Sequence, residues 1–291
     1  MKFPISFIKD DKLVLNVDSV NFKTICPRVV KFNEGFYRMY FSQQKKLVDR
    51  YSYYTTIRSA VSKDCINWSL EGGDRLGNLS DERFCRMLSP SVIKIDSSLY
   101  RMYFEARTFD NEGVIKSALS NDGVLWKEEQ GIRIGKLNNF SYGTPFCFME
   151  IKNQFELYFE KRSKLTRDIW VATSSDGIFF DERNILPVLK QEKIWESYAV
   201  YSPDLIYSNN LYHLFYSGWG GDPLMGHILY AYSYDKKNWK KYETPIISPG
   251  AKYDYSHCSE PSLIKIDDKW KIFYEGCDSN KLWRILCAQQ S

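Results

Sequence analysis

One pattern recurs five times along the 291-residue chain and constrains its fold more than any other feature. Each copy reads x-Pro-x, a short apolar run, a polar turn and an aromatic-rich run, as in CPRVVKFNEGFYRMYFSQ from Cys26. The copies begin near residues 26, 89, 144, 202 and 260, and the intervals between their prolines are 63, 55, 58 and 58 residues. Five units of about 58 residues account for the whole chain, so the repeat determines the architecture.

Four of the units carry a second signature in which a serine, an aspartate and an aromatic residue keep fixed spacings. The segments are SKDCINW, SNDGVLW, SSDGIFF and SYDKKNW, which begin at Ser62, Ser120, Ser174 and Ser233. An aspartate in a tight turn bonds the backbone two residues on, and a glycine after it accepts positive φ. The element resembles the sialidase Asp box with one residue fewer. A repeated structural turn is favoured over a ligand or metal loop.

The runs between these turns predict an all-β protein, because they are rich in Tyr, Phe, Val and Ile and lack a 3.6-residue apolar period. Four strands per unit predict a five-bladed β-propeller of four-stranded antiparallel blades, since radial closure protects sheet edges. The last unit stops after its third strand, whereas SFIKDDKLVLN precedes the first repeat. We expect this N-terminal strand to close the last blade, so that residues 1–291 form a single domain.

Composition excludes several classes of protein. Apolar residues make up 44% and aromatic residues 16%, which is too much for a disordered chain. No apolar run approaches the length of a membrane span, and the first residues lack the layout of a signal peptide. A net charge of +4 without a long basic block argues against nucleic acid as a partner. Seven scattered cysteines indicate buried thiols in a reducing cytoplasm, and neither a metal nor another cofactor is expected.

Candidate site residues lie where the start of each first strand and the end of each second strand meet at one face. Glu105, Glu160 and Glu275 hold an equivalent place at the ends of three second strands. Arg107 and Arg162 follow the first two by two residues and share their strand faces. Two interpretations stay open. The glutamates form structural ion pairs, or they face one another so that repulsion raises at least one pKa.

A second set of residues is expected to bind the ligand. Arg28, Arg86, Arg107 and Arg162, together with His257, suit an anionic group, because guanidinium grips phosphate or carboxylate bidentately. The alternative is that these arginines only neutralise the glutamates. Trp219 is expected to stack on a sugar ring, and its flanking glycines are expected to let the segment approach a ligand closely.

These blade starts, tyrosine-rich second strands and Ser-x-Asp closures resemble the five-bladed glycoside hydrolase superfamily, which includes families 43, 32, 68 and 130. YSPDLIYSNNLYHLFYSG is similar to the Ala-Pro-Asp blade of arabinanase-type enzymes, and SEPSLIKIDDKWKIFYEG to their Asp-Pro blade. The resemblance covers the whole chain. It implies a carbohydrate-active enzyme that cleaves or transfers a glycosidic bond with carboxylates in a central funnel. The phosphorylase branch of the superfamily binds phosphate with an arginine cluster.

The catalytic pattern of the superfamily is altered in this chain. Inverting members use an Asp base at the first blade start, an Asp that tunes pKa and a Glu acid. Here Cys26 stands where the first Asp is expected, and Thr144 precedes a proline where the Glu motif is expected. Acids remain at Glu260 and Asp204. The expected catalytic residues are Glu260, Glu105 and Asp204, with Glu105 or Glu260 as the acid. The expected substrate-binding residues are Arg28, Arg86, Arg107, Glu160, Arg162, Trp219, His257 and Glu275.

Two functions remain open at this point. Relocated carboxylates retain a glycosidase-like mechanism, or the funnel has lost hydrolysis. In the second case it binds a sugar or an anionic small molecule, or serves a pathway enzyme derived from a glycosidase scaffold. The expected partner is a small-molecule carbohydrate or an anionic sugar derivative, with no nucleic acid and no membrane.

Overall fold

A computed structural model describes residues 6–33, 35–45, 54–136, 140–266 and 268–291. Its strands form consecutive groups that follow the sequence repeat. The first two groups are β2 (Phe22–Asn33), β3 (Phe36–Lys45), β4 (Thr55–Ser62) and β5 (Ser69–Leu70), then β6 (Phe84–Asp96), β7 (Leu99–Thr108), β8 (Gly113–Ser120) and β9 (Lys127–Glu128). The next two are β10 (Ser141–Phe148), β11 (Phe155–Arg162), β12 (Arg167–Ser174) and β13 (Leu186–Leu189), then β14 (Ala199–Ser208), β15 (Leu211–Gly220), β16 (Met225–Ser233) and β17 (Lys240–Lys241). The last comprises β18 (His257–Ile266), β19 (Lys269–Cys277) and β20 (Trp283–Gln290).

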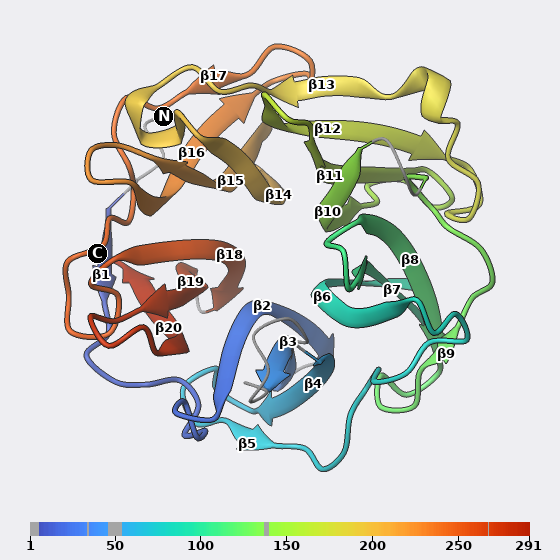
Figure 1. The fold of residues 1–291 in the computed structure, drawn as a ribbon, viewed down its shortest axis with the longest axis horizontal. Helices are drawn as coiled ribbons and strands as arrows, with labels where there is room; N and C mark the ends of the chain where they lie inside the picture. The colour runs from blue at the N-terminus through green and yellow to red at the C-terminus, as the bar shows by residue number, and fades with distance from the viewer. Residues whose placement is uncertain (1–5, 34, 46–53, 137–139, 267) are drawn as a thin grey trace.

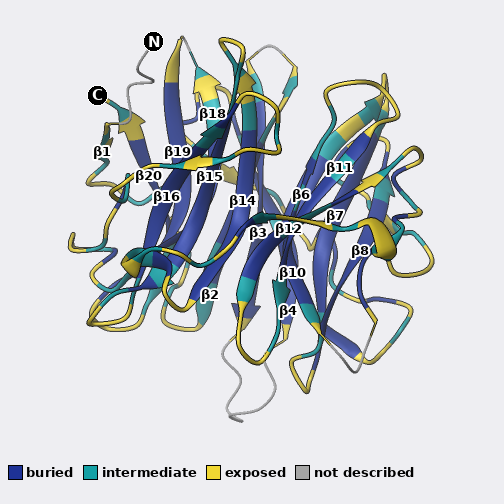
Figure 2. Cartoon of the chain, turned by 90° about the horizontal axis from the view of Figure 1, so that it is seen from above, coloured by how far each residue is buried: buried dark blue, intermediate teal, exposed yellow. Residues whose placement is uncertain are grey.

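Within each group the strands pair antiparallel in chain order, as alternation of apolar runs and turns predicts. Figure 1 shows the groups arranged around a common centre, with β2, β6, β10, β14 and β18 nearest to it. Parallel bridges at Thr55–Arg86 and Gly226–His257 join neighbouring groups. Figure 2 shows that the buried residues follow the long strands, whereas the exposed residues lie mainly in the connections at their ends.

The N-terminal strand joins the last group, as expected. β1 (Phe7–Lys9) pairs antiparallel with β20, and Phe7 lies opposite Gln290. The Lys9 ammonium forms an ion pair of 2.6 Å with the buried carboxylate of Asp254 and donates to the carbonyl of Ser248. Both ends of the described chain are therefore held in one sheet, in the order β1-β20-β19-β18.

An aromatic pair in the middle of each second strand builds the core. The pairs are Tyr40–Phe41, Tyr103–Phe104, Tyr158–Phe159, Phe215–Tyr216 and Phe273–Tyr274, and all ten rings are fully buried. Successive strand residues point to opposite faces, so each pair sends one ring to each neighbouring group. Tyr40, for example, packs with residues of the second group and Phe41 with residues of the last. Burying each ring contributes roughly 1.5–3 kcal/mol.

The Ser-x-Asp elements are structural turns, which confirms that interpretation. In the second unit the Ser120 hydroxyl donates to Asp122 at 3.0 Å, and the same carboxylate oxygen accepts the N–H groups of Val124 and Leu125. The carbonyl of Gly123 accepts the Tyr40 hydroxyl of the preceding unit at 2.8 Å. The Tyr103 hydroxyl makes the same bond to Gly177 in the third unit, and in all four turns the aspartate accepts N–H groups of its own turn.

Two short 3₁₀ helices, η1 (Glu182–Asn184) and η2 (Ile194–Glu196), interrupt the strands. Among the described residues, no helix is both long enough and apolar enough to cross a bilayer. All seven cysteines are unpaired and buried, as predicted.

Candidate functional site

The residue before the recurring proline has an unusual backbone in all five repeats. Its φ lies in the left-handed region at Cys26 (55°), Ser89 (48°), Thr144 (44°), Ser202 (48°) and Glu260 (55°). A residue before proline normally favours extended backbone, and left-handed non-glycine residues cost free energy. The pairing register of first and second strands shifts at each of these positions. The bulges break the two-residue alternation and leave four of these side chains lining a central cavity.

The bulges are supported by bonds between neighbouring units. The backbone N–H of Ser89 donates to Ser42 Oγ at 3.1 Å, and that of Glu260 donates to Ser217 Oγ at 2.8 Å. Glu105 and Glu275 occupy the same second-strand position as these serines. They accept the N–H groups of Thr144 (3.1 Å) and Cys26 (3.0 Å), respectively. Both glutamates therefore have a structural partner that elsewhere in the molecule a hydroxyl satisfies.

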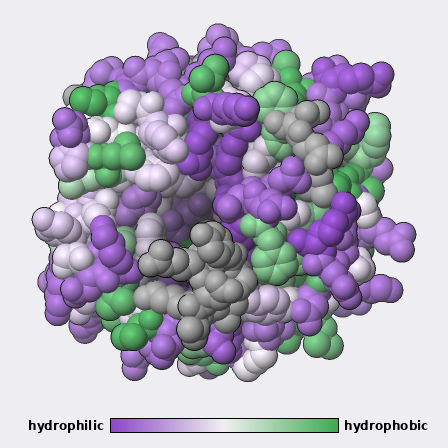
Figure 3. All heavy atoms as spheres, in the orientation of Figure 1, coloured by the Kyte–Doolittle hydropathy of each residue, from purple (hydrophilic) through white to green (hydrophobic). Residues whose placement is uncertain are grey.

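The central cavity has a volume of about 350 Å³. Figure 3 shows it as a hollow in the middle of one face, bordered largely by hydrophilic residues. Of the predicted site residues, eight line it: Arg86, Glu105, Arg107, Arg162, Trp219, His257, Glu260 and Glu275. Arg28, Glu160 and Asp204 are not among the residues that line it.

Asp204 and Arg28, which do not line this cavity, are partners of each other. Arg28 Nη1 lies 2.5 Å from Asp204 Oδ2, which also accepts the N–H of Leu263 at 2.9 Å. The guanidinium lies 4.9 Å from the ring centroid of Phe146. Burial raises the pKa of Asp204 to about 6 although Arg28 opposes the rise. These contacts link the first, third, fourth and last units and leave the expected catalytic role of Asp204 without geometric support.

Glu105 is enclosed by two arginines. The Arg107 Nε donates to its Oε1, and Arg162 donates to both oxygens at 2.8 and 3.2 Å. Burial disfavours the carboxylate, but the charges of Arg107 and Arg162 outweigh it and hold the pKa of Glu105 well below its ordinary value. A Cβ at Gly143 would collide with Glu105, so the glycine before Thr144 makes room for this cluster.

Arg162 also binds Glu160, the equivalent glutamate of its own repeat. Arg162 Nη2 lies 2.6 Å from Glu160 Oε2, and Glu160 Oε1 accepts a hydrogen bond from Arg167 Nε at 2.7 Å. Arg167 lies directly opposite Arg162 in the β11–β12 hairpin and lines the cavity, yet the sequence reasoning missed it. The signal was present, because a four-residue turn SKLT places Arg167 beside the end of the second strand.

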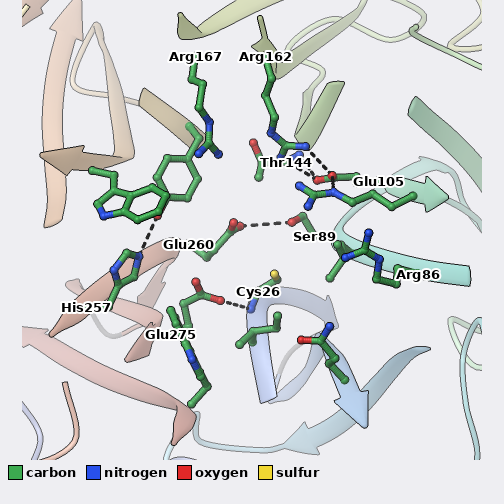
Figure 4. A pocket seen from close by; sticks show the side chains of 17 residues that line it. Cys26, Arg86, Ser89, Glu105, Thr144, Arg162, Arg167, His257, Glu260 and Glu275 are labelled. Carbon is green, nitrogen blue, oxygen red and sulfur yellow. Dashed lines mark hydrogen bonds and ion pairs between the residues drawn. The ribbon is translucent and has the colours of Figure 1, made fainter. Parts of the chain in front are cut away.

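Glu260 lies in a different environment near the middle of the cavity (Figure 4). Its Oε2 accepts Ser202 Oγ at 2.6 Å and lies 3.5 Å from Ser89 Oγ. No ion pair involves Glu260 among the described residues. Burial, followed by repulsion from Glu275, raises its pKa far above the ordinary value. Glu260 is therefore suited to carry a proton at neutral pH.

Glu275 and Cys26 lie beside Glu260. Glu275 accepts Ser259 Oγ at 2.6 Å as well as the Cys26 N–H, and burial raises its pKa. Burial, with Glu260 and Glu275, also raises the pKa of the Cys26 thiol. A thiol held protonated in this way is no base, so Cys26 does not replace the expected aspartate.

Aromatic side chains form another part of the lining. His257 Nε2 is 3.1 Å from the Tyr201 hydroxyl, and its ring contacts Trp219 and Trp283 at centroid distances of 6.0 and 5.2 Å. Burial, reinforced by His227, lowers the pKa of His257 to about 4. His257 is thus a neutral hydrogen-bonding group at pH 7 and adds no charge for an anion.

The glycines beside Trp219 serve packing, which corrects the expected reason for them. A Cβ at Gly218 would lie 2.7 Å from the carbonyl of Trp195, and one at Gly220 would lie 2.6 Å from the backbone nitrogen of Glu196. Trp219 itself belongs to β15, and its two flanking glycines make room for the segment containing η2.

Arg86 lies on the side of the cavity opposite His257 (Figure 4). Its guanidinium donates to the carbonyl of Thr108 at 3.1 Å and to Asn111 Oδ1 at 2.7 Å. These partners are neutral, so Arg86 keeps its charge available to the cavity. Within the described ranges, no three His, Cys, Asp or Glu side chains are arranged to hold a metal ion.

Comparison with solved structures confirms the resemblance to the glycosidase superfamily at the level of the fold. A glycoside hydrolase has a TM-score of 0.82 at 15% identity, covering 98% of this chain and 92% of the other. A β-1,2-mannobiose phosphorylase from Listeria innocua gives 0.78 at 15% identity, covering 98% and 96%. A thermostable family-43 glycoside hydrolase gives 0.71 at 18% identity, covering 92% and 88%. The chain has an all-β fold similar to those of family 43 and family 130 glycosidases and mannoside phosphorylases.

Sequence comparison leads to phosphorylases. No family model matches the chain. The β-1,2-mannobiose phosphorylase of Thermoanaerobacter sp. (strain X514) is 28% identical, over 46% of this chain and 61% of that enzyme. The 1,2-β-oligomannan phosphorylase of the same organism is 31% identical, over 31% of this chain and 33% of that enzyme. The match thus spans less than two thirds of the length of either curated relative.

Proposed function

We propose that the chain is a carbohydrate-active enzyme that cleaves or transfers a glycosidic bond in the central cavity, with Glu260 as the proton donor. The observation that carries this proposal is the environment of Glu260, a buried carboxyl that lines the cavity and has no cationic partner among the described residues. General acid catalysis of glycoside cleavage needs a carboxyl that keeps its proton near the working pH. Glu105 does not meet this requirement, because Arg107 and Arg162 favour its charged form.

We further propose that the acceptor of the glycosyl group is phosphate in preference to water. Hydrolysis with inversion needs a second carboxylate to activate water, whereas phosphate is already a charged nucleophile. Asp204 is buried against Arg28, and Glu275 accepts a hydroxyl and a backbone N–H. By contrast, Arg86, Arg107, Arg162 and Arg167 all line the cavity, and the carboxylates paired with them among the described residues are those of Glu105 and Glu160, which leaves an excess of two positive charges. Such an excess suits a bound anion.

The proposed reaction uses the aromatic side chains, Glu260 and the arginines of the cavity. A sugar ring stacks on the aromatic lining that includes Trp219 and Trp283, with its glycosidic oxygen near Glu260. A phosphate oxygen held by the arginines attacks the anomeric carbon while Glu260 protonates the departing oxygen. The products are a sugar 1-phosphate and a shortened saccharide. The curated relatives act on β-1,2-mannobiose and 1,2-β-oligomannan, so β-mannosides are the first substrates to test.

We also propose that residues 1–291 form one five-bladed propeller closed by β1. Five hydrophobic clusters, each shared by two neighbouring units, support this architecture. The pairing of β1 with β20 supports closure.

The direct test is incubation of the purified protein with β-mannosides and other glycosides, with and without inorganic phosphate. The products are followed by phosphorus NMR. The proposal expects a sugar 1-phosphate that requires phosphate and is lost in Glu260→Gln. If no glycoside is turned over while calorimetry detects a sugar or phosphate in the cavity, the non-hydrolytic binding function replaces it. Release of free sugar without phosphate would instead identify a hydrolase.

A further inference from the structure

Two serines from distant repeats converge on one oxygen of Glu260. Ser202 of β14 donates to Oε2 at 2.6 Å, and Ser89 of β6 lies 3.5 Å from the same atom. Both serines and Glu260 are the left-handed residues that precede the prolines of their repeats. The side chain of Ser202 is almost fully buried, so its hydroxyl has little access to water. The repeat geometry therefore gathers these three side chains at one point.

The backbones of the two closest partners are fixed independently. The Ser202 N–H donates to Thr144 Oγ1 at 3.0 Å, and the Glu260 N–H donates to Ser217 Oγ at 2.8 Å. With both backbones held and Oε2 bonded to Ser202, rotation of the Glu260 carboxyl would break a short buried hydrogen bond. Oε1 accepts no hydrogen bond from the described residues, although Glu260 lines the cavity.

We propose that Ser202 is a positioning residue that holds Glu260 Oε2 and thereby presents Oε1, with the acid proton, to the substrate. This inference rests on the proposed role of Glu260 as proton donor. In the reaction the O–H bond at Oε1 breaks, and the proton passes to the glycosidic oxygen as its bond to the anomeric carbon breaks. The electron pair stays on the carboxylate, where the Ser202 hydroxyl donates to the charge that develops on Oε2. Ser89, at the longer distance, gives weaker support.

Several other groups affect the titration of Glu260, and they enter the interpretation of any pH profile. Glu275 on β19 is the largest source of repulsion, followed by Glu105 on β7 and Glu160 on β11. Cys26 on β2 and Tyr201 on β14 also interact electrostatically with Glu260. Ser202 itself favours the charged form, so its removal raises the pKa of Glu260 further.

The test is Ser202→Ala in the full chain, measured as kcat and KM against pH for the glycoside and phosphate identified above. We expect kcat to fall about tenfold with KM nearly unchanged, and the alkaline limb to move up by about one pH unit. Ser202→Thr should restore both, because Thr144 shows that threonine is accommodated at an equivalent left-handed position. An unchanged pH limb and kcat in folded Ser202→Ala would overturn the proposal.

Ser91→Ala is the matched control. Ser91 is also a buried serine, and its hydroxyl accepts the N–H of Cys147 across a unit boundary at 2.9 Å without contacting Glu260. We expect a loss of stability from this variant but no movement of the pH limb.

A second readout does not depend on turnover. The carbonyl stretch of protonated Glu260 is assigned by infrared difference against Glu260→Gln and titrated in wild type and Ser202→Ala. A band that titrates at higher pH in Ser202→Ala supports positioning even if the glycoside reaction fails. An unmoved band refutes positioning whatever the reaction proves to be.

Discussion

Glu105 and Glu275 occupy the same position in two repeats and accept the same backbone bond from the next unit, yet their pKa values shift in opposite directions. Arg107 and Arg162 outweigh burial at Glu105 and lower its pKa, whereas burial dominates at Glu275 and raises its pKa. The repeat fixes where each carboxylate lies. The charged neighbours, which differ from repeat to repeat, decide whether it keeps its proton.

The strongest test of this comparison removes the cation that two glutamates share. Arg162→Met leaves Glu105 and Glu160 with one arginine each in a buried site. We expect it to reduce the free energy of unfolding by about 1.5–3 kcal/mol, because each buried glutamate loses the charge-assisted hydrogen bonds of one of its two arginines. Urea denaturation at pH 7 measures the change.

The control for Arg162 is Arg83→Met. Arg83 pairs with Asp81 on the surface, where solvent screens the charges and a salt bridge contributes little to stability. A loss at Arg162 no larger than that at Arg83 would show that the cationic cluster adds no more than a surface pair.

Glu260 shares with Glu275 a pKa that burial raises. The variant Glu260→Gln therefore tests the other side of the comparison. Glutamine keeps the size and the acceptor for Ser202 but cannot donate an acidic proton. We expect kcat to fall about 100- to 1,000-fold, within the range for loss of a general acid, with the thermal unfolding temperature maintained or raised. Glu105→Gln is the contrasting variant, since it should lower stability more than it affects protonation of the leaving group. A reversed result would exchange the two roles.

Stability against pH separates the two environments without a substrate. A carboxyl whose pKa is raised by folding binds its proton more tightly when folded, so stability falls as pH rises from about 4.3 to the raised value. This applies to Glu260 and Glu275. The lowered pKa of Glu105 has the opposite sign, and its contribution is lost as pH falls below the ordinary carboxyl range.

The measurement is urea unfolding of wild type and Glu260→Gln at several pH values from 4 to 9. Each proton released in this window changes the free energy of unfolding by about 1.4 kcal/mol per pH unit. We expect the stability of Glu260→Gln relative to wild type to increase with pH. A constant difference between the two proteins would mean that folding does not raise the pKa of Glu260.

The sequence predicted the strand groups, the role of β1 and the Ser-x-Asp turns because each depends on local pattern and repetition. Four of the five x-Pro-x starts contribute a side chain to the cavity, and of the predicted catalytic residues Glu105 and Glu260 line it whereas Asp204 does not. The left-handed backbone before each proline was not predicted, since that position ordinarily favours extended backbone.

What sequence could not supply was the pairing across units. Asp204 and Arg28 are 176 residues apart, and nothing local indicates that each is the other's partner. Arg167 begins a third strand, so it lies outside the first-strand starts and second-strand ends that the repeat pattern marks as site positions. The distinction between Glu105 and Glu260 depends on these long-range arginine contacts and therefore required coordinates.

The smallest expected effect concerns the aromatic lining. If Trp219 stacks on a sugar, Trp219→Ala should raise KM for the glycoside about 5- to 10-fold, as loss of roughly 1 kcal/mol of stacking implies, with kcat little changed. Trp126 is the matched control. It packs edge-on against Tyr40 between units, away from the cavity. Trp126→Ala should lower thermal stability and leave KM unaltered. Equal KM values in both variants would assign Trp219 to packing as well, and recognition would then rest on the polar groups alone.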